Sequence, residues 1–215
     1  MAEILDILDK DGKLLQTRER SSYYKSIKQE YALKGSIETQ IKQVRLLLMN
    51  TDGRIYLQKR SAAKGENPGL WDKSIEGHVP SGSAFDTAII RECAEELGFA
   101  AVVLRDEEFW RAVDQMHLEI IGVLRPVDTR LFWKSRRTTE TGETFELPLT
   151  VATYIGYYNG HVRFVDGESS GLVVFSCEEL LKELSEHKAL YTNDLSIMIK
   201  EYCGLLRPYE VVSAG

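Results

Sequence analysis

Residues 77–99 read GHVPSGSAFDTAIIRECAEELGF, and the second half of this stretch predicts a helix with two different faces. Ser83 is placed to cap the helix N-terminus, Asp86 follows in the first turn, and Gly98 is placed to end it, so we expect a helix over residues 84–97. At about 100° per residue, the apolar side chains share one arc, which suits packing on a sheet. These side chains are Ile89, Ile90, Cys93, Ala94 and Leu97.

Three glutamates, Glu92, Glu95 and Glu96, share the adjoining arc of this expected helix. Positions three and four apart are neighbours on a helix, and a like-charge pair there costs a few tenths of a kcal/mol. A divalent cation removes that cost, and carboxylate oxygens are ligands that Mg²⁺ and Mn²⁺ prefer. The alternative is a solvated acidic face, and three glutamates alone do not decide against it.

The residues around the glutamates follow a longer pattern. Gly77 starts it, and Arg91 begins the run Arg-Glu-apolar-any-Glu-Glu-any-Gly-apolar that ends it at Phe99. This arrangement resembles the Nudix box, the signature of Nudix hydrolases. One position departs from the signature, because Ser83 stands where the box has its first Glu. Arg91 must then find another partner, for which Asp86 and Glu95 are the candidates.

The resemblance implies a fold and a chemistry. The fold is α/β, a Nudix-type α/β/α sandwich with a mixed sheet. Glu92, Glu95 and Glu96 would bind Mg²⁺ or Mn²⁺ with help from the Gly77 carbonyl, and Glu95, Glu96 and Arg91 would serve catalysis. The implied reaction is attack of water on a small-molecule diphosphate, with metal ions bridging phosphate oxygens that carboxylates would otherwise repel.

Segments before the box resemble one branch of the family, which includes isopentenyl-diphosphate isomerase. The matching runs are Gln58-Lys59-Arg60-Ser61, Pro68-Gly69-Leu70-Trp71-Asp72 and Gly77-His78-Val79. By this resemblance Lys59 and Arg60 would bind substrate phosphate and Trp71 would line the pocket; the structural alternatives are a solvated strand end and a core anchor. Such isomerases carry a catalytic Cys between that Trp and the box, and residues 72–76 contain none. Isomerase activity is therefore disfavoured.

A further group is expected from across the cleft, because three glutamates on one helix reach the phosphates from one side only. Glu168 is the first candidate, since it comes just before an expected apolar strand. Glu143 and Glu146 are its rivals, in a polar stretch over residues 134–146 that suits a mobile substrate loop or an exposed hairpin. Glu76 is either an additional carboxylate at the metal site or a surface acid.

The composition of the whole chain excludes several classes of function. Of 215 residues, 43% are hydrophobic and 28% are charged, which is typical of a globular protein. The formal net charge of -6 makes the chain too acidic for general binding to the nucleic-acid backbone. The chain has no run of about 18 apolar residues and no signal peptide pattern, so no membrane is expected and the location is predicted to be cytoplasmic. Cys93, Cys177 and Cys203 are too few and scattered for a disulfide framework, which favours a reducing compartment.

The remaining pattern predicts interleaved strands and helices in two regions. Residues 1–38 are expected to form an N-terminal arm with a strand and a helix, followed by the Nudix domain over residues 39–215; such arms often mediate pairing, so a homodimer is the expectation. The expected strands cover residues 4–8, 41–49, 54–59, 151–158, 161–165 and 172–175, and the expected helices cover residues 21–33, 84–97, 106–121, 177–186 and 194–202.

Two kinds of function remain open. The first is a metal-dependent hydrolase that cleaves a diphosphate linkage in a nucleoside diphosphate derivative or a related small molecule. The second is a non-catalytic nucleotide-binding module on the same fold, which the departure at Ser83 favours and the intact glutamates disfavour.

Overall fold

The central feature of the computed structural model, which describes residues 2–163, 167 and 169–210, is a mixed sheet. Its strands lie in the order β10-β4-β3-β9-β8-β7, with β5 paired to β4 and β6 to β3. The pairs β3–β9 and β7–β8 are parallel and the others antiparallel. The strands are β3 Ile41–Met49, β4 Ile55–Arg60, β5 Trp71–Asp72, β6 Ile75–His78, β7 Ala100–Val103, β8 Ile121–Thr138, β9 Thr144–Tyr157 and β10 Ser169–Phe175.

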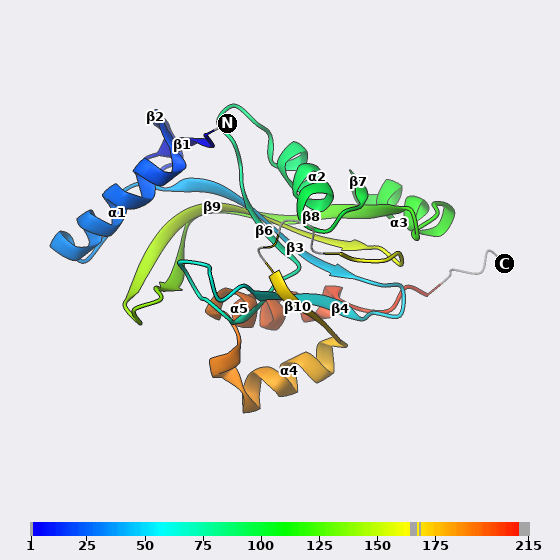
Figure 1. The fold of residues 1–215 in the computed structure, drawn as a ribbon. Helices are drawn as coiled ribbons and strands as arrows, with labels where there is room; N and C mark the ends of the chain where they lie inside the picture. Colours follow the sequence, from blue (N-terminus) through cyan, green and yellow to red (C-terminus); the bar gives the residue numbers. More distant parts are fainter. Residues whose placement is uncertain (1, 164–166, 168, 211–215) are drawn as a thin grey trace.

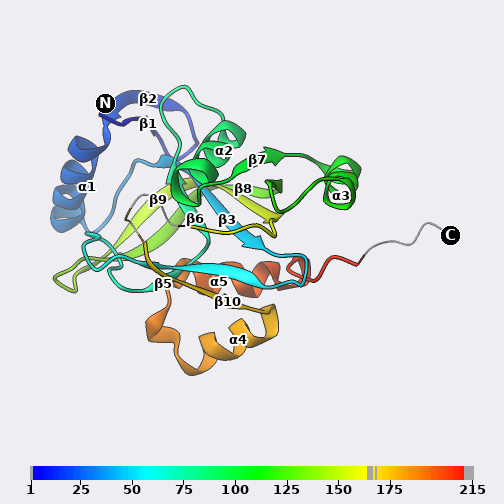
Figure 2. The same ribbon diagram turned by 45° about the vertical axis from the view of Figure 1, so that its right-hand side comes forward.

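Different helices cover the two faces of this sheet, and the alternation along β3 decides what each face buries. Helix α2 (Phe85–Glu96) packs with Leu46 and Leu48, whereas α4 (Cys177–Glu186) and α5 (Asn193–Tyr202) pack in the core that holds Leu47. Figures 1 and 2 show α2 on one side of the sheet and α4 with α5 on the other. The α/β/α sandwich with a mixed sheet is thereby confirmed.

The arm packs against one end of the sheet (Figure 1). It consists of an antiparallel ribbon, β1 (Ile4–Leu8) with β2 (Leu14–Glu19), and helix α1 (Arg20–Lys34), which ends at Gly35 in the left-handed region at φ 72°. Sequence patterning predicted β1 and α1 but not β2, whose side chains are mostly exposed. A third apolar core joins the arm to the sheet through Leu5, Ile7, Tyr23, Ile27, Ile37, Ile41, Phe145, Leu147, Leu149 and Val151.

Three local expectations were wrong. Helix α2 begins one residue later than expected, with Ala84 rather than Ser83 at the N-cap and no side-chain cap; the Ser83 amide donates to the Pro80 carbonyl at 2.9 Å in the preceding turn. Helix α3 (Asp106–Gln115) stops well before residue 121, which starts β8. Residues 161–163 form no strand, and residues 164 and 165, the rest of that expected strand, lie outside the described residues.

The polar stretch over residues 134–146 is a hairpin rather than a loop, since β8 and β9 pair as far as Thr138 and Thr144, and it is exposed on one face only, because Ser135, Arg137 and Phe145 are buried. Glu143 and Glu146 are both exposed there, and Glu146 forms an ion pair with Lys134 at 3.3 Å.

The cysteines differ from the expectation in one respect. Cys177 and Cys203 form a disulfide between the start of α4 and the end of α5, with their Cα atoms 5.8 Å apart. Cys93 is free and buried in the core beneath α2, as predicted for a packing residue. Of the helices in the described ranges, none has the length and apolarity needed to cross a lipid bilayer.

Candidate active site

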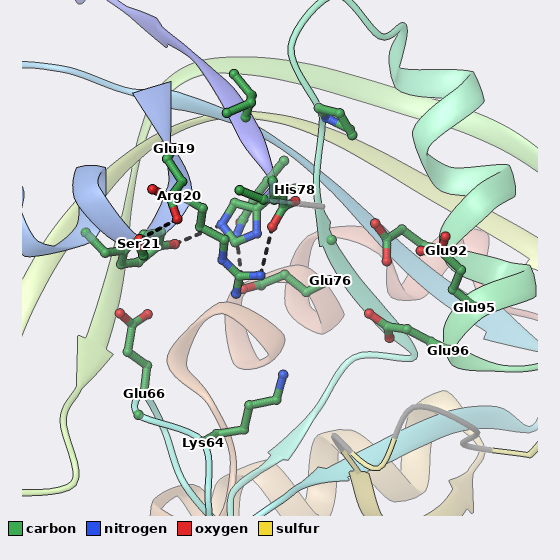
Figure 3. Close-up of a pocket in the computed structure, with 18 of the residues that line it drawn as sticks. Glu19, Arg20, Ser21, Lys64, Glu66, Glu76, His78, Glu92, Glu95 and Glu96 are labelled. Atoms are coloured by element: carbon green, nitrogen blue, oxygen red, sulfur yellow. Dashed lines mark hydrogen bonds and ion pairs between the residues drawn. The ribbon is translucent and has the colours of Figure 1, made fainter. Parts of the chain in front are cut away.

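A cavity of about 980 Å³ lies beside α2 and collects most of the residues that the sequence singled out. Figure 3 shows Glu92, Glu95 and Glu96 extending into it from α2, with the start of α1 opposite and the loop that carries Lys64 and Glu66 below. Its lining includes Glu3, Arg20, Tyr24, Arg60, Lys64, Glu66, Glu76, Gly77, His78, Arg91, Glu92, Glu95, Glu96 and Arg137. The elements that meet here are therefore α2, β6, the loop after β4 and the arm.

Gly77 and Glu92 share one corner of the cavity. A Cβ atom on residue 77 would lie 2.6 Å from Glu92 Oε1, closer than real Cβ contacts allow. The glycine at the start of the box is thus required by the close approach of the Glu92 carboxylate to the β6 backbone.

Arg91 holds the glutamates of α2. Its Nη2 donates to Glu92 Oε1 at 2.7 Å and lies 3.5 Å from the His78 carbonyl oxygen, while its Nε lies 3.6 Å from Glu95 Oε2. Of the two partners proposed from the sequence, Glu95 is therefore correct and Asp86 is wrong. Asp86 instead accepts from Arg105 and from the Tyr154 hydroxyl, each at 2.6 Å.

The donor set on α2 fits a divalent cation. Burial raises the pKa of Glu92, Arg91 offsets part of that effect, and the neighbouring Glu95 adds to it, so the negative charge on Glu92 is incompletely compensated. Glu96 is equally buried, whereas the Glu95 side chain is 59% exposed and can rotate at little cost. In the described ranges no three acidic, His or Cys side chains lie close enough together to hold an ion as they stand, and the exposed Glu95 side chain is the one of the three glutamates best able to reorient.

Glu76 is neither a surface acid nor an uncompensated carboxylate. Its side chain is 5% exposed and lies 2.5 Å from both Lys73 Nζ and Arg137 Nη2 and 3.4 Å from Arg45 Nε. Burial would raise its pKa, but Arg137, Lys73 and Arg45 hold the pKa well below its usual range. Asp194 of α5 joins this network through Arg45 at 2.6 Å, so the floor beneath the cavity is a set of buried, mutually paired charges.

The residues expected to bind substrate divide between two places. Arg60 lines the cavity, donates to the Glu66 carbonyl at 2.9 Å and forms an ion pair with Asp72 at 3.3 Å. Lys59 and Trp71 do not line it; the Lys59 Nζ lies 5.5 Å from the Trp71 ring centroid, and that ring packs against the core of α4 and α5. Glu168 lies outside the described residues.

Sequence reasoning missed the contribution of the arm. Glu3, Arg20 and Tyr24 all line the cavity, and the Tyr24 hydroxyl lies 2.9 Å from His78 Nε2. These positions lie 53 to 74 residues before Gly77, so no local spacing pattern could have revealed them.

Comparison with known proteins identifies the family of the domain that carries this cavity. A model of the NUDIX domain matches residues 39–195. An isopentenyl-diphosphate delta-isomerase of Salmonella arizonae is 45% identical over 51 residues, which cover 24% of this chain and 28% of that protein. An uncharacterized Nudix hydrolase of Pseudomonas aeruginosa is 38% identical over 61 residues, covering 28% of this chain and 36% of that protein. The chain thus matches only about a third of the length of these curated relatives.

Solved structures share the fold along most of the chain. The DR0079 protein of Deinococcus radiodurans superposes with a TM-score of 0.63 at 19% identity, covering 93% of this chain and 98% of its own. The MutT protein of Methanosarcina mazei has a TM-score of 0.51, also at 19% identity, covering 76% of this chain and 92% of its own. At this identity the likeness concerns the fold alone.

Proposed function

The chain belongs to the NUDIX domain family, and from this premise we propose that it is a metal-dependent pyrophosphohydrolase. It would cleave a diphosphate linkage in a nucleoside diphosphate derivative or a related small molecule. The observation that carries the proposal is the meeting of Glu92, Glu95, Glu96 and Gly77 at one wall of a large polar cavity. Catalytic roles for Glu95, Glu96 and Arg91 are part of the proposal.

Each residue of this wall has a chemical task in the proposed reaction. Glu92, Glu95 and Glu96 of α2 would hold Mg²⁺ or Mn²⁺ together with the Gly77 carbonyl, and Arg91 would keep Glu92 in place. When bound, the metal would neutralise phosphate oxygens and lower the pKa of a bound water. Glu95 or Glu96 would accept the proton of the attacking water as general base.

Two other functions are less well supported. An isomerase would need a reactive group near the substrate, yet Cys93 is buried beneath α2, where burial raises the pKa of its thiol. A non-catalytic binding module would not need the buried carboxylate of Glu92, whose charge Arg91 compensates only in part.

Replacement of Glu96 by Gln should lower metal-dependent hydrolysis at least about a hundredfold, because it removes a metal-binding charge at nearly constant shape. A panel of nucleoside diphosphate sugars, dinucleotides and other diphosphates, each with Mg²⁺ and Mn²⁺, would be followed by mass spectrometry in ¹⁸O-labelled water. Glu107→Gln, on the first turn of α3, is the matched control and should keep full activity. Label on a phosphorus of the product supports the hydrolase; metal-dependent binding without any turnover would favour the binding module.

The remaining expectations belong to the same proposal. Glu168→Gln should lower kcat if Glu168 completes the site, and Lys59→Gln or Trp71→Phe should raise KM if those residues contact substrate.

We also propose a homodimer, to be checked by light scattering, and a cytoplasmic location. The Cys177–Cys203 disulfide weighs against that location, because disulfides persist mainly in oxidising compartments; a thiol count on protein isolated under alkylating conditions would decide.

A further inference from the structure

The arm supplies a wall of the cavity opposite the glutamates. Arg20 and Ser21 at the start of α1 face across the cavity from Glu92, Glu95 and Glu96 of α2 (Figure 3). A diphosphate held at α2 therefore extends toward a surface that the arm provides. Which part of the substrate this surface contacts depends on which of its charged side chains can bind an anion.

The arm is fixed in register with the box, so its side chains hold defined positions. The Ser81 amide donates to the Ile4 carbonyl at 2.8 Å, and the Ser81 hydroxyl donates to Asp6 Oδ1 at 2.6 Å. Lys42 of β3 adds an ion pair with Asp6 at 3.2 Å. On the α1 side, Tyr24 bonds His78, the residue after Gly77.

Several other cations of the cavity are committed to partners inside the protein. Arg137 is 3% exposed and pairs with Glu76, and Arg60 is 12% exposed and pairs with the fully buried Asp72. Withdrawing either cation would remove part of the positive charge that compensates a buried carboxylate, which is destabilising even though Lys73 also pairs with both carboxylates. Arg91 is bound to the glutamates of α2 themselves. These three guanidinium groups cannot turn to a ligand at low cost.

Arg20 differs from them in its partner. Its Nη1 lies 2.9 Å from Glu3 Oε2, but the two side chains are 47% and 28% exposed. Such an exposed ion pair contributes little net stability, so another anion can replace the carboxylate at small cost. The guanidinium, which lies 6.0 Å from the Tyr24 ring centroid, has the planar donor fork that suits phosphate oxygens.

We propose that Arg20 is a substrate-binding residue whose guanidinium binds phosphate oxygens of the diphosphate. In the absence of substrate the guanidinium pairs with Glu3, and the substrate replaces Glu3 on binding. This rests on the proposed function for the identity of the ligand. It makes the N-terminal arm part of the binding site rather than an appendage. Substitutions of Arg20 and Glu3 should therefore change affinity in opposite directions, because Glu3 and the substrate compete for the Arg20 guanidinium.

Calorimetric titration with methylenediphosphonate, a diphosphate analogue that cannot be hydrolysed, tests this in the presence of Mg²⁺. Arg20→Gln should raise the Kd about tenfold, and Arg20→Lys should recover part of the loss. Glu3→Gln should instead lower the Kd a few-fold. Arg18→Gln is the control, since Arg18 lies on β2, does not line the cavity and donates to Ser26 at 2.9 Å. Thermal unfolding of each variant would verify that it is folded.

The opposite signs separate binding from a merely structural role. If Arg20 only held the arm in place through Glu3, both substitutions would weaken binding together, and the proposal would be overturned. An unchanged Kd in Arg20→Gln would overturn it as well. With a hydrolysed substrate, Arg20→Gln should raise KM and leave kcat nearly unchanged. If the wild type hydrolyses nothing but the Kd values follow the predicted pattern, the proposed function fails while the assignment of Arg20 stands.

Discussion

His78 connects the arm to the helix that carries the glutamates. Its Nε2 bonds the Tyr24 hydroxyl at 2.9 Å, and its carbonyl oxygen lies 3.5 Å from Arg91 Nη2. Burial lowers the pKa of His78 to about 3, compared with an ordinary value of 6.5, and the nearby Arg20 acts in the same direction. The ring is therefore neutral in the folded protein at every pH at which the enzyme would be assayed.

That shift makes stability depend on pH. Because the folded pKa is depressed, the unfolded chain binds a proton below about pH 6.5 that the folded chain does not, so stability falls as pH drops from about 6.5 toward 3. Between pH 7.5 and 5.0 the wild type should lose roughly 2 kcal/mol more than His78→Gln, at about 1.4 kcal/mol per pH unit. Urea unfolding at the two pH values measures this. Substitution of His117, an exposed histidine, should leave the wild-type difference intact.

At the scale of elements, the packing of β6 against α2 depends on the absence of one atom. Gly77→Ala would bring a Cβ within 2.6 Å of Glu92 Oε1, so Glu92 or the strand must move. We expect a loss of about 1 to 3 kcal/mol in unfolding free energy and a clear weakening of Mn²⁺ binding by calorimetry. Gly65→Ala is the matched control, because a Cβ there meets nothing within 4 Å. Wild-type Mn²⁺ affinity in Gly77→Ala would show that this corner is not part of the metal site.

The elements also show what a sequence can and cannot predict. Helices α2 and α4 were predicted to within a residue because their apolar arcs and end signals are local. The buried charges beneath the cavity could not be predicted, since Arg45 and Asp194 are 149 residues apart and meet only after β3 and α5 have packed. The cap position was also missed: α2 starts after Ala84, with no side-chain cap, and the Ser83 amide donates to the Pro80 carbonyl in the preceding turn.

For the whole molecule, the family pattern predicted the sandwich and the grouping of Glu92, Glu95 and Glu96 on α2. It did not predict where the arm packs. The box fixes one helix and one strand, and the known architecture follows from them by resemblance. The arm has no such pattern, and its contacts with the sheet are made by apolar side chains that any strand or amphipathic helix would carry. The arm docks where it can bury the apolar side chains at this end of the sheet, and these side chains come together only when the sheet has formed.

Deleting residues 1–38 should therefore destabilise the domain rather than release it intact. Leu5, Ile7, Tyr23, Ile27 and Ile37 are each at most 4% exposed, and burying one such side chain contributes about 1.5 to 3 kcal/mol. Their combined loss is comparable to the 5 to 15 kcal/mol that stabilises a typical domain. We expect residues 39–215 alone to bind a hydrophobic dye and to lack a cooperative thermal transition.

Two substitutions on α1 measure the same dependence in the full chain. Ile27→Ala should cost about 2 to 5 kcal/mol in urea unfolding, because Ile27 is 1% exposed in the shared core. Leu33→Ala, on the same helix but 87% exposed, should change stability by less than about 0.5 kcal/mol. Equal and small losses in the two variants, together with an unshifted melting temperature for residues 39–215, would mean that the sheet is stable without the arm. The arm would then be an independent unit, and its side chains would reach the cavity only while it is docked.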